Sequence, residues 1–313
     1  MPDRRFAIYP GADSTKANAT VRNFDQRWHS VQQIGNNQDQ RIEGAGGSIY
    51  GIYGNPNGTN MLTDLLDHNC TAIQLAFTNV NGKDTQGKEP RAVKRAAMQR
   101  TVSGEHDALY TKAFQTMKRS PWENIILRLG SEGDIPWPPH SFVPGSTGGR
   151  GNDDIYRDAF KHVRSLAVSI LGRDRVKFVY TTTAFAGMQS MLCADGKTRT
   201  KIAAGYPGMA YCDYIGVDFY LNQDSLDKHK TRFSKHVAFA KSKLLPLVID
   251  EWGFTPDGHK HPIQTQIDFV KFIDAQTTKT SPYISFFLGW ADSKFPDDYS
   301  FPARDAIKNM KLV

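Results

Sequence analysis

Eight short apolar runs divide this chain, and segments with helical spacing lie between several of them. Continuous apolar runs bounded by turn residues are typical of strands buried on both faces, as in a parallel sheet. The runs are Arg5–Tyr9, Gly47–Tyr53, Ala72–Phe77, Asn124–Leu129, Val176–Thr181, Tyr214–Phe219, Leu245–Asp250 and Ile284–Gly289. Strands that alternate with helices form either a closed parallel barrel or an open doubly wound sheet.

Apolar stripes that would pack on such a sheet recur at intervals of three and four residues. They are Phe24, Trp28 and Val31; Leu62, Leu65 and Leu66; Tyr156, Phe160 and Val163; and Ile263, Ile267 and Val270. No GxGxxG motif follows the first run and no Walker A loop occurs, which disfavours a nucleotide-binding sheet. A length of 313 residues suits one barrel with insertions. We therefore predict an α/β fold, a (β/α)8 TIM barrel, with residues 1–313 forming a single domain.

Composition and charge exclude several classes of protein. No run of 18 apolar residues occurs, so we expect no membrane span. No signal peptide is visible, so we expect either a cytoplasmic protein or a secreted or periplasmic one whose export segment was removed. The net charge of +7 favours polyanionic partners, but no helix-turn-helix, zinc-finger or RNP pattern points to nucleic acid. We expect a monomer.

The cysteines and histidines do not indicate a metal site. Cys70, Cys193 and Cys212 lack CxxC spacing and are best interpreted as buried thiols. A bridge between Cys193 and Cys212 stays open for an exported protein. His259 and His261 form a close pair, but they lie in a polar stretch, and no HExxH motif occurs. We expect neither a metal nor another cofactor.

Two glutamates lie where predicted strands end. Glu132 follows the run Asn124–Leu129, and Glu251 follows Leu245–Asp250. The carboxyl ends of barrel strands form the face on which active sites lie. Two carboxyl groups converging there are the minimum equipment for cleaving a glycosidic bond. A separation of roughly 5 Å would retain the anomeric configuration, whereas roughly 6.5–9.5 Å would invert it.

Polar residues near these glutamates fit such a site. Arg128 shares a strand face with Glu132, so it should point into the barrel and pair with a carboxylate. Asp218 and Tyr220 share a face at the end of another strand, and Tyr220 could donate a hydrogen bond to Glu251. Asp250 should point the other way, toward the helices. The alternative is a buried ion pair that has no part in catalysis.

Three tryptophans near strand ends are candidates for contact with a sugar. Trp137 follows Glu132, Trp252 follows Glu251, and Trp290 follows the eighth run. The apolar C–H faces of sugars stack on aromatic rings, although a single tryptophan more often packs in a core. Three of them at strand ends favour a sugar-binding floor.

The motifs around these residues resemble those of glycoside hydrolase family 26. The resemblance rests on Arg128–Glu132 with Trp137, on Ile215–Tyr220, on Pro246–Gly253, and on Ile8–Asp13 with Phe24–Trp28. It implies a (β/α)8 barrel and a retaining mechanism. It further implies that Glu132 is the general acid/base and Glu251 the nucleophile, that Tyr220 hydrogen-bonds Glu251, and that Trp290 lines the −1 site.

Ser131 departs from the family pattern. Mannanases of the family carry His at this position, before the acid/base, so mannan specificity does not carry over directly. Together with the net charge, the shorter serine suggests an acidic bacterial exopolysaccharide. The residues expected to bind substrate are Arg128, Ser131, Trp137, Asp218, Tyr220, Trp252 and Trp290.

We therefore predict a retaining, endo-acting glycoside hydrolase that acts on a β-linked polysaccharide or oligosaccharide by double displacement. Two alternatives remain. One is a barrel hydrolase or lyase of another class that uses Asp218 or Asp134. The other is a carbohydrate-binding barrel that has no catalytic activity.

Overall fold

The structure is a computed structural model of the chain. It describes residues 5–9, 31–34, 72–77, 79–80, 89–119, 124–144, 148–255, 257–280, 283–287 and 306. Every structural statement below concerns these residues.

Eight parallel strands close into a barrel in the order β1-β10-β9-β8-β5-β4-β3-β2. Their bounds are β1 (Arg5–Tyr9), β2 (Val31–Ile34), β3 (Ala72–Phe77), β4 (Asn124–Leu129), β5 (Val176–Thr183), β8 (Tyr214–Leu221), β9 (Leu247–Phe254) and β10 (Tyr283–Phe287). A separate antiparallel hairpin consists of β6 (Ser190–Leu192) and β7 (Thr198–Thr200). Because the barrel strands are parallel, the carboxyl ends of β4 and β9 open on the same rim.

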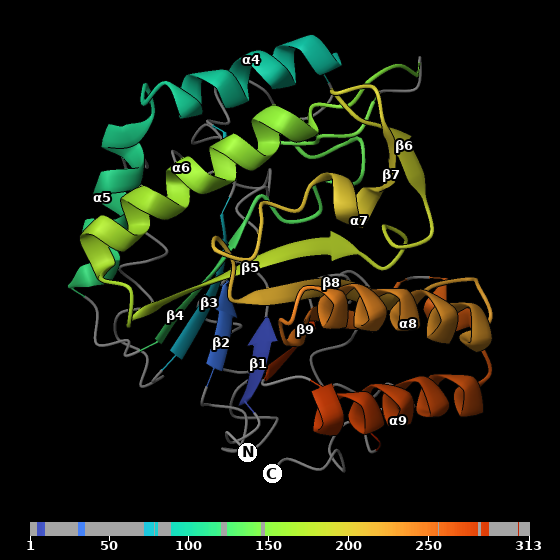
Figure 1. The fold of residues 1–313 in the computed structure, drawn as a ribbon. Coiled ribbons are helices and arrows are strands. Elements are labelled where there is room, and N and C mark those ends of the chain that lie inside the picture. Colours follow the sequence, from blue (N-terminus) through green and yellow to red (C-terminus); the bar gives the residue numbers. More distant parts are fainter. Residues whose placement is uncertain are drawn as a thin grey trace.

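Helices cover the outside of the barrel. They are α4 (Arg91–Val102), α5 (Asp107–Lys118), α6 (Asp153–Leu171), α7 (Lys201–Ala204), α8 (Leu226–Ser242) and α9 (Ile263–Thr280), with a 3₁₀ turn η3 (Gly258–Lys260). Figure 1 shows α4, α5 and α6 on one side of the barrel and α8 and α9 on the other. None of the helices described is long and apolar enough to cross a membrane.

The predicted barrel is confirmed, and most predicted strands are present. β1, β3 and β4 have the predicted bounds, whereas β5, β8 and β9 extend two to four residues further toward their carboxyl ends. The predicted helix containing Val31 is wrong at that residue, because Val31 begins strand β2 and pairs with Ala7 and Ala72. Strand pairing on both sides of Val31 outweighs the helical preference that a short apolar stripe indicates. The predicted strand Gly47–Tyr53 lies outside the described residues, as does the stripe at Leu62, Leu65 and Leu66.

Helix α6 illustrates how the sequence forms the outer layer. The predicted stripe is confirmed, because Tyr156, Phe160 and Val163 are fully buried in the core between helices and strands. Two aspartates lie in the first turn, where their negative charges interact favourably with the positive end of the helix dipole. Gly172, with φ +85°, ends the helix. The stripe predicted for α9 is only partly confirmed, because Ile263 is exposed whereas Val270 is buried.

The interior of the barrel is filled in layers, because alternate side chains of each strand point inward. Ile126, Val179 and Val248 form a small apolar cluster, separate from the core beneath the helices. Two residues further along the same three strands, the buried side chains are polar. These are Arg128, Thr181 and Asp250.

A β-bulge in β9 changes the orientation of the next residues. Val217 of β8 pairs with Ile249, but Asp218 pairs with Glu251, so Asp250 has no partner in the register. Such a bulge breaks the strict alternation of side chains. Asp250 and Glu251 accordingly both contact the same arginine inside the barrel. The predicted outward orientation of Asp250 is therefore wrong.

The room for Asp250 comes from Gly216 of β8. A Cβ atom on Gly216 would lie 1.8 Å from Asp250 Oδ2 and 2.7 Å from Thr181 Oγ1. We expect Gly216→Ala to lower the free energy of unfolding by about 1–3 kcal/mol, as overpacking of a core does. Denaturant unfolding measures this loss. If the carboxylate is the obstacle, the double variant with Asp250→Ala should lose less than the sum of the two single variants. Additive losses would contradict this packing.

Candidate active site

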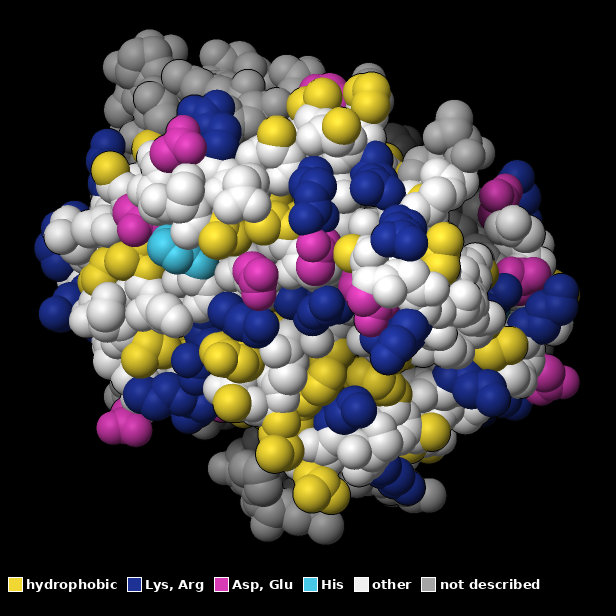
Figure 2. Space-filling model, turned by 45° about the horizontal axis from the view of Figure 1, so that its top comes forward, with side chains coloured by type: hydrophobic (Ala, Val, Ile, Leu, Met, Phe, Trp, Pro, Cys, Tyr) yellow, Lys and Arg dark blue, Asp and Glu magenta, His cyan; other side chains and the backbone are white. Residues whose placement is uncertain are grey.

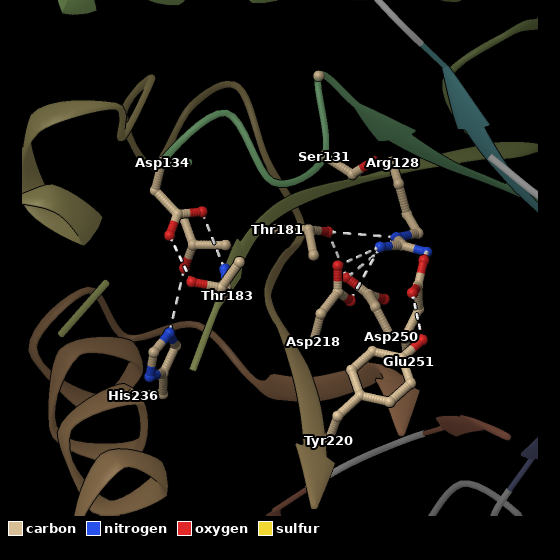
Figure 3. Close-up of polar contacts among 12 residues, drawn as sticks. Arg128, Ser131, Asp134, Thr181, Thr183, Asp218, Tyr220, His236, Asp250 and Glu251 are labelled. Atoms are coloured by element: carbon tan, nitrogen blue, oxygen red, sulfur yellow. Dashed lines mark hydrogen bonds and ion pairs between the residues drawn. The ribbon is translucent and has the colours of Figure 1, made fainter. Parts of the chain in front are cut away.

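The candidate active site is built around the guanidinium of Arg128, which lies fully buried inside the barrel. Its Nη1 donates to Glu251 Oε1 at 2.5 Å, and its Nη2 donates to the two oxygens of Asp218 at 2.9 and 2.8 Å. Its Nε faces Thr181 Oγ1 at 3.5 Å and Asp250 Oδ2 at 3.6 Å. Figure 3 shows these side chains converging on the guanidinium. One cation is thus shared by three carboxyl groups.

Of these three carboxyl groups, that of Glu251 reaches the surface of the site. Its side chain is 8% exposed, whereas those of Asp218 and Asp250 are 0% exposed. Glu251 Oε2 accepts a hydrogen bond from the Tyr220 hydroxyl at 2.6 Å, and Oε1 accepts from Arg128. Donors on both oxygens fix the orientation of the carboxylate. The expected contacts of Glu251 with Arg128 and Tyr220 are both present.

The excess of acid over base shifts the pKa values in the cluster. Burial alone would lower the pKa of Arg128, but the charges of Asp218, Glu251 and Asp250 outweigh burial and hold that pKa well above its usual range. Burial raises the pKa of Asp218 well above its usual range, although Arg128 opposes this shift, and the nearby carboxylates raise it further. Burial and the neighbouring negative charges therefore both favour the protonated form of Asp218.

Glu132 lies in the turn that follows β4, and its backbone is left-handed, with φ +55°. Such a conformation is uncommon for a residue other than glycine and persists where the surroundings hold it. The backbone N–H of Glu132 donates to the Thr181 carbonyl at 3.3 Å. Burial raises the pKa of Glu132 to about 8, with further contributions from the charges of Glu251 and Asp134, while Arg128 opposes the shift. Glu132 and Glu251 therefore interact electrostatically in one site.

Asp134 anchors the turn that carries Glu132. Its Oδ1 accepts from the Thr183 backbone N–H at 2.9 Å, and its Oδ2 accepts from the Thr183 hydroxyl at 2.5 Å. Burial raises the pKa of Asp134 to about 6, against the two hydrogen bonds from Thr183. With both oxygens engaged by the end of β5, Asp134 ties this loop to the barrel.

Ser131 and Trp137 occupy different surroundings on this loop. Ser131 is buried, and its carbonyl oxygen lies 2.7 Å from His140 Nε2. Burial lowers the pKa of His140 to about 4, so the neutral imidazole donates this bond. Trp137 is 51% exposed, and Lys94 donates to the carbonyl oxygen of the preceding Pro136. An exposed tryptophan on the loop that bears Glu132 is accessible to a ligand.

Three expected substrate contacts need correction. Arg128 and Asp218 lie beneath Glu251 with fully buried side chains, so they hold the carboxyl groups in place and do not offer a surface to a sugar. Trp252 is also fully buried, and its ring packs against Phe269 of α9, 6.5 Å between ring centroids. The residue after an inward-pointing Glu251 faces the helices, because side chains alternate along the strand. Trp290 lies outside the described residues.

Two polar residues of the site were not predicted. Thr181 has a sequence signal only in the run Thr181–Thr183 at a strand end, and Asp250 was predicted on the wrong face. Cys193 and Cys212 are buried free thiols, so no bridge joins them, and Cys70 lies outside the described residues. Within the described ranges, no three His, Cys, Asp or Glu side chains gather as a metal site would require.

The sequence model described as Glycosyl hydrolase family 26 matches residues 137–312, which is more than half of the chain. The matched part contains Asp218, Tyr220 and Glu251 and begins five residues after Glu132. No curated protein matches the chain in sequence.

Solved structures share the fold at low sequence identity. The catalytic domain of the Bacillus sp. JAMB-750 GH26 endo-β-1,4-mannanase matches with a TM-score of 0.60 and 12% identity, covering 96% of this chain and 85% of that one. A modular endo-β-1,4-mannanase from Cellulomonas fimi matches with a TM-score of 0.61 and 13% identity, over 97% and 74% of the two chains. GH26C from Muricauda sp. MAR_2010_75 matches with a TM-score of 0.58 and 11% identity, over 96% and 90%.

The raised pKa of Glu132 predicts a pH-dependent stability. Between the usual value of 4.5 and about 8, folded protein keeps this proton while unfolded protein has released it. The contribution of Glu132 to stability is therefore full below about pH 4.5 and is lost as the pH rises toward 8. Glutamine does not titrate, so the melting temperature of Glu132→Gln relative to the parent should rise between pH 5 and pH 8. Calorimetry at several pH values measures this difference.

Glu105→Gln provides the matched control. Hydrogen bonds from Arg100 and Ser103 lower the pKa of the exposed Glu105. That carboxylate is ionised in both the folded and the unfolded protein from pH 5 upward, so its difference from the parent should stay constant. A constant difference for Glu132→Gln as well would contradict the raised pKa.

Proposed function

The chain belongs to glycosyl hydrolase family 26 and is a glycoside hydrolase, and from this premise we propose that it cleaves a β-linked polysaccharide with retention of configuration. Its substrate is a polysaccharide, as the family implies. The observation that carries the proposal is the contrast between two carboxyl groups in one site. Glu251 has a hydrogen-bond donor on each oxygen, whereas burial raises the pKa of Glu132 to about 8.

In the first step, Glu251 attacks the anomeric carbon, and Glu132 gives its proton to the leaving glycosidic oxygen. The C–O bond to the leaving chain breaks as the bond to Glu251 forms, which leaves a glycosyl-enzyme and an ionised Glu132. In the second step, Glu132 takes a proton from water, and the resulting hydroxide displaces Glu251 from the anomeric carbon. Each residue then returns to its starting state.

The surroundings of the two glutamates support these roles. A general acid must hold its proton at the working pH, which the buried and negatively charged setting of Glu132 favours. A nucleophile must present an oxygen in a fixed direction, and the hydrogen bonds from Arg128 and Tyr220 hold the Glu251 carboxyl group in that way. The exposed ring of Trp137 is suited to stack on a sugar beyond the point of cleavage.

The proposal extends to the substrate. We infer an endo-acting enzyme for an acidic bacterial exopolysaccharide, supported by the net charge of +7 and by Ser131 at a position where the mannanases of the family carry His. Figure 2 shows Lys and Arg side chains spread over one face and interspersed with Asp and Glu, rather than gathered in one patch. Attraction of a polyanion would therefore come from the overall charge. The solved mannanases of similar fold favour β-1,4-mannan as the rival substrate.

Substitution of the two glutamates tests the mechanism, because azide enters from different faces of the sugar. In Glu251→Ala, turnover should be abolished, and azide should replace the nucleophile to give a glycosyl azide of inverted configuration. In Glu132→Ala, azide should react with the glycosyl-enzyme and give the retained configuration, after a rate loss of about 10²–10⁴ on unactivated substrate. NMR of the products distinguishes the two anomers.

The exposed Glu105→Ala serves as the control for these variants and should keep the activity of the parent. Full activity of Glu251→Ala would refute its assignment as nucleophile. Exchanged anomers between the two variants would reverse the roles of Glu132 and Glu251.

A panel of β-1,4-mannan, xanthan and succinoglycan tests the substrate proposal through the release of reducing ends. We expect an acidic polymer to be cleaved fastest, with rapid loss of chain length as endo action requires. The rate at limiting substrate should fall as NaCl rises from about 0.1 M to 1 M, because the screening length shortens from about 10 Å to about 3 Å. Preferential cleavage of neutral mannan at a rate that salt does not change would contradict the acidic substrate.

A further inference from the structure

Asp250 is a buried carboxylate that the two-step mechanism does not use. It lies at the bulge in β9 and points into the barrel, where its Oδ2 lies 3.6 Å from Arg128 Nε. The same oxygen accepts a hydrogen bond from the Thr181 hydroxyl. Its side chain is 0% exposed, so it cannot touch substrate.

The position of Asp250 completes the surroundings of the guanidinium. Arg128 presents a planar fork of five N–H donors. Glu251 takes Nη1 and Asp218 takes Nη2, while the Nε edge faces Asp250 and Thr181. Contacts on three edges fix both the plane of the guanidinium and its rotation within that plane. The direction of the hydrogen bond to Glu251 Oε1 follows from that orientation.

Two features of the chain accommodate the inward-pointing carboxylate of Asp250 beside Glu251. Asp250 follows the inward-facing Val248 by two residues, so alternation points it into the barrel. The register shift after Val217 lets the next residue, Glu251, face the same side. Any side chain on Gly216 would collide with Asp250 Oδ2, at 1.8 Å for a Cβ atom. Asp250 therefore has no partner in the strand register, and Gly216 beside it has no side chain.

We propose that Asp250, together with Thr181, is a positioning residue that sets the orientation of Arg128 and, through it, of the Glu251 carboxylate. This inference rests on the proposed role of Glu251 as nucleophile. It assigns no chemical step to Asp250, which acts through the guanidinium.

Three variants test this role: Asp250→Asn, Thr181→Val and the matched control Thr182→Val. Thr182 is the next residue of β5, is equally buried, and its hydroxyl contacts His236 Nε2 at 3.1 Å on the helix side of the strand. Each threonine variant therefore loses one buried hydroxyl, but only Thr181→Val loses it beside Arg128.

Kinetics are measured on whichever of β-1,4-mannan, xanthan and succinoglycan the parent cleaves fastest. We expect Thr181→Val and Asp250→Asn to lower kcat by about 10- to 100-fold with little change in KM, as small displacements of a reacting group do. Thr182→Val should keep the kcat of the parent. The charge of Asp250 helps to raise the pKa of Asp218 in a cluster that also contains Arg128, Glu251 and Glu132. Asp250→Asn should therefore move the acidic limb of the kcat/KM profile to lower pH.

A readout without substrate separates this proposal from the proposed function. The ¹⁵N-edited NMR signal of the Arg128 Nε–H, identified by its loss in Arg128→Lys, should exchange slowly with water in the parent and in Thr182→Val. Exchange should be faster in Thr181→Val and Asp250→Asn. These NMR changes would support the positioning role even if no polysaccharide were cleaved, whereas that failure would count against the proposed function.

Two results would overturn the positioning role. One is a parent-like NMR signal and parent-like kcat in both Thr181→Val and Asp250→Asn. The other is a loss of kcat that matches the loss of folded protein, equals that of Thr182→Val and leaves the pH profile unmoved.

Discussion

The ion pairing of a single buried guanidinium with three carboxyl groups is the interaction on which the site depends. Arg128 comes from β4, its carboxylate partners come from β8 and β9, and Thr181 comes from β5. Charges this deeply buried are tolerated only when they are paired and hydrogen-bonded. Removal of the guanidinium would leave the carboxyl groups uncompensated, and loss of one partner of a buried pair typically costs about 3–5 kcal/mol. These ion pairs and hydrogen bonds connect four neighbouring strands of the barrel, β4, β5, β8 and β9.

This arrangement gives two glutamates of the same chemistry different surroundings. Glu251 receives donors from Arg128 and Tyr220, whereas Glu132 sits in a buried turn where nearby negative charge raises its pKa. Two carboxyl groups can take different roles, one as acid and one as nucleophile, when their environments differ in this way. The turn itself is held by Asp134 on the end of β5. The contacts that hold the strands and the turn in place therefore also set the electrostatic surroundings of the two glutamates.

Apolar runs and the alternation of side chains along strands predicted the fold and part of the candidate site. The barrel, the placement of Glu132 just after β4 and the inward direction of Arg128 follow from such runs, whereas Glu251, expected just after its strand, lies within β9. The patterns did not predict that Asp250 and Glu251 both point inward, because a bulge depends on how β8 and β9 pair. Trp252 was expected at the site, but it follows the inward-facing Glu251 along the strand and packs against Phe269 of α9.

The central claim is that Glu132 keeps its proton at neutral pH beside Glu251. Its direct test is the pH titration of the Glu132 side-chain carboxyl by ¹³C NMR in protein labelled at glutamate, with the signal identified by its loss in Glu132→Gln. The account predicts a midpoint near pH 8. A midpoint near the usual value of 4.5 would contradict it, because Glu132 would then have no proton to give.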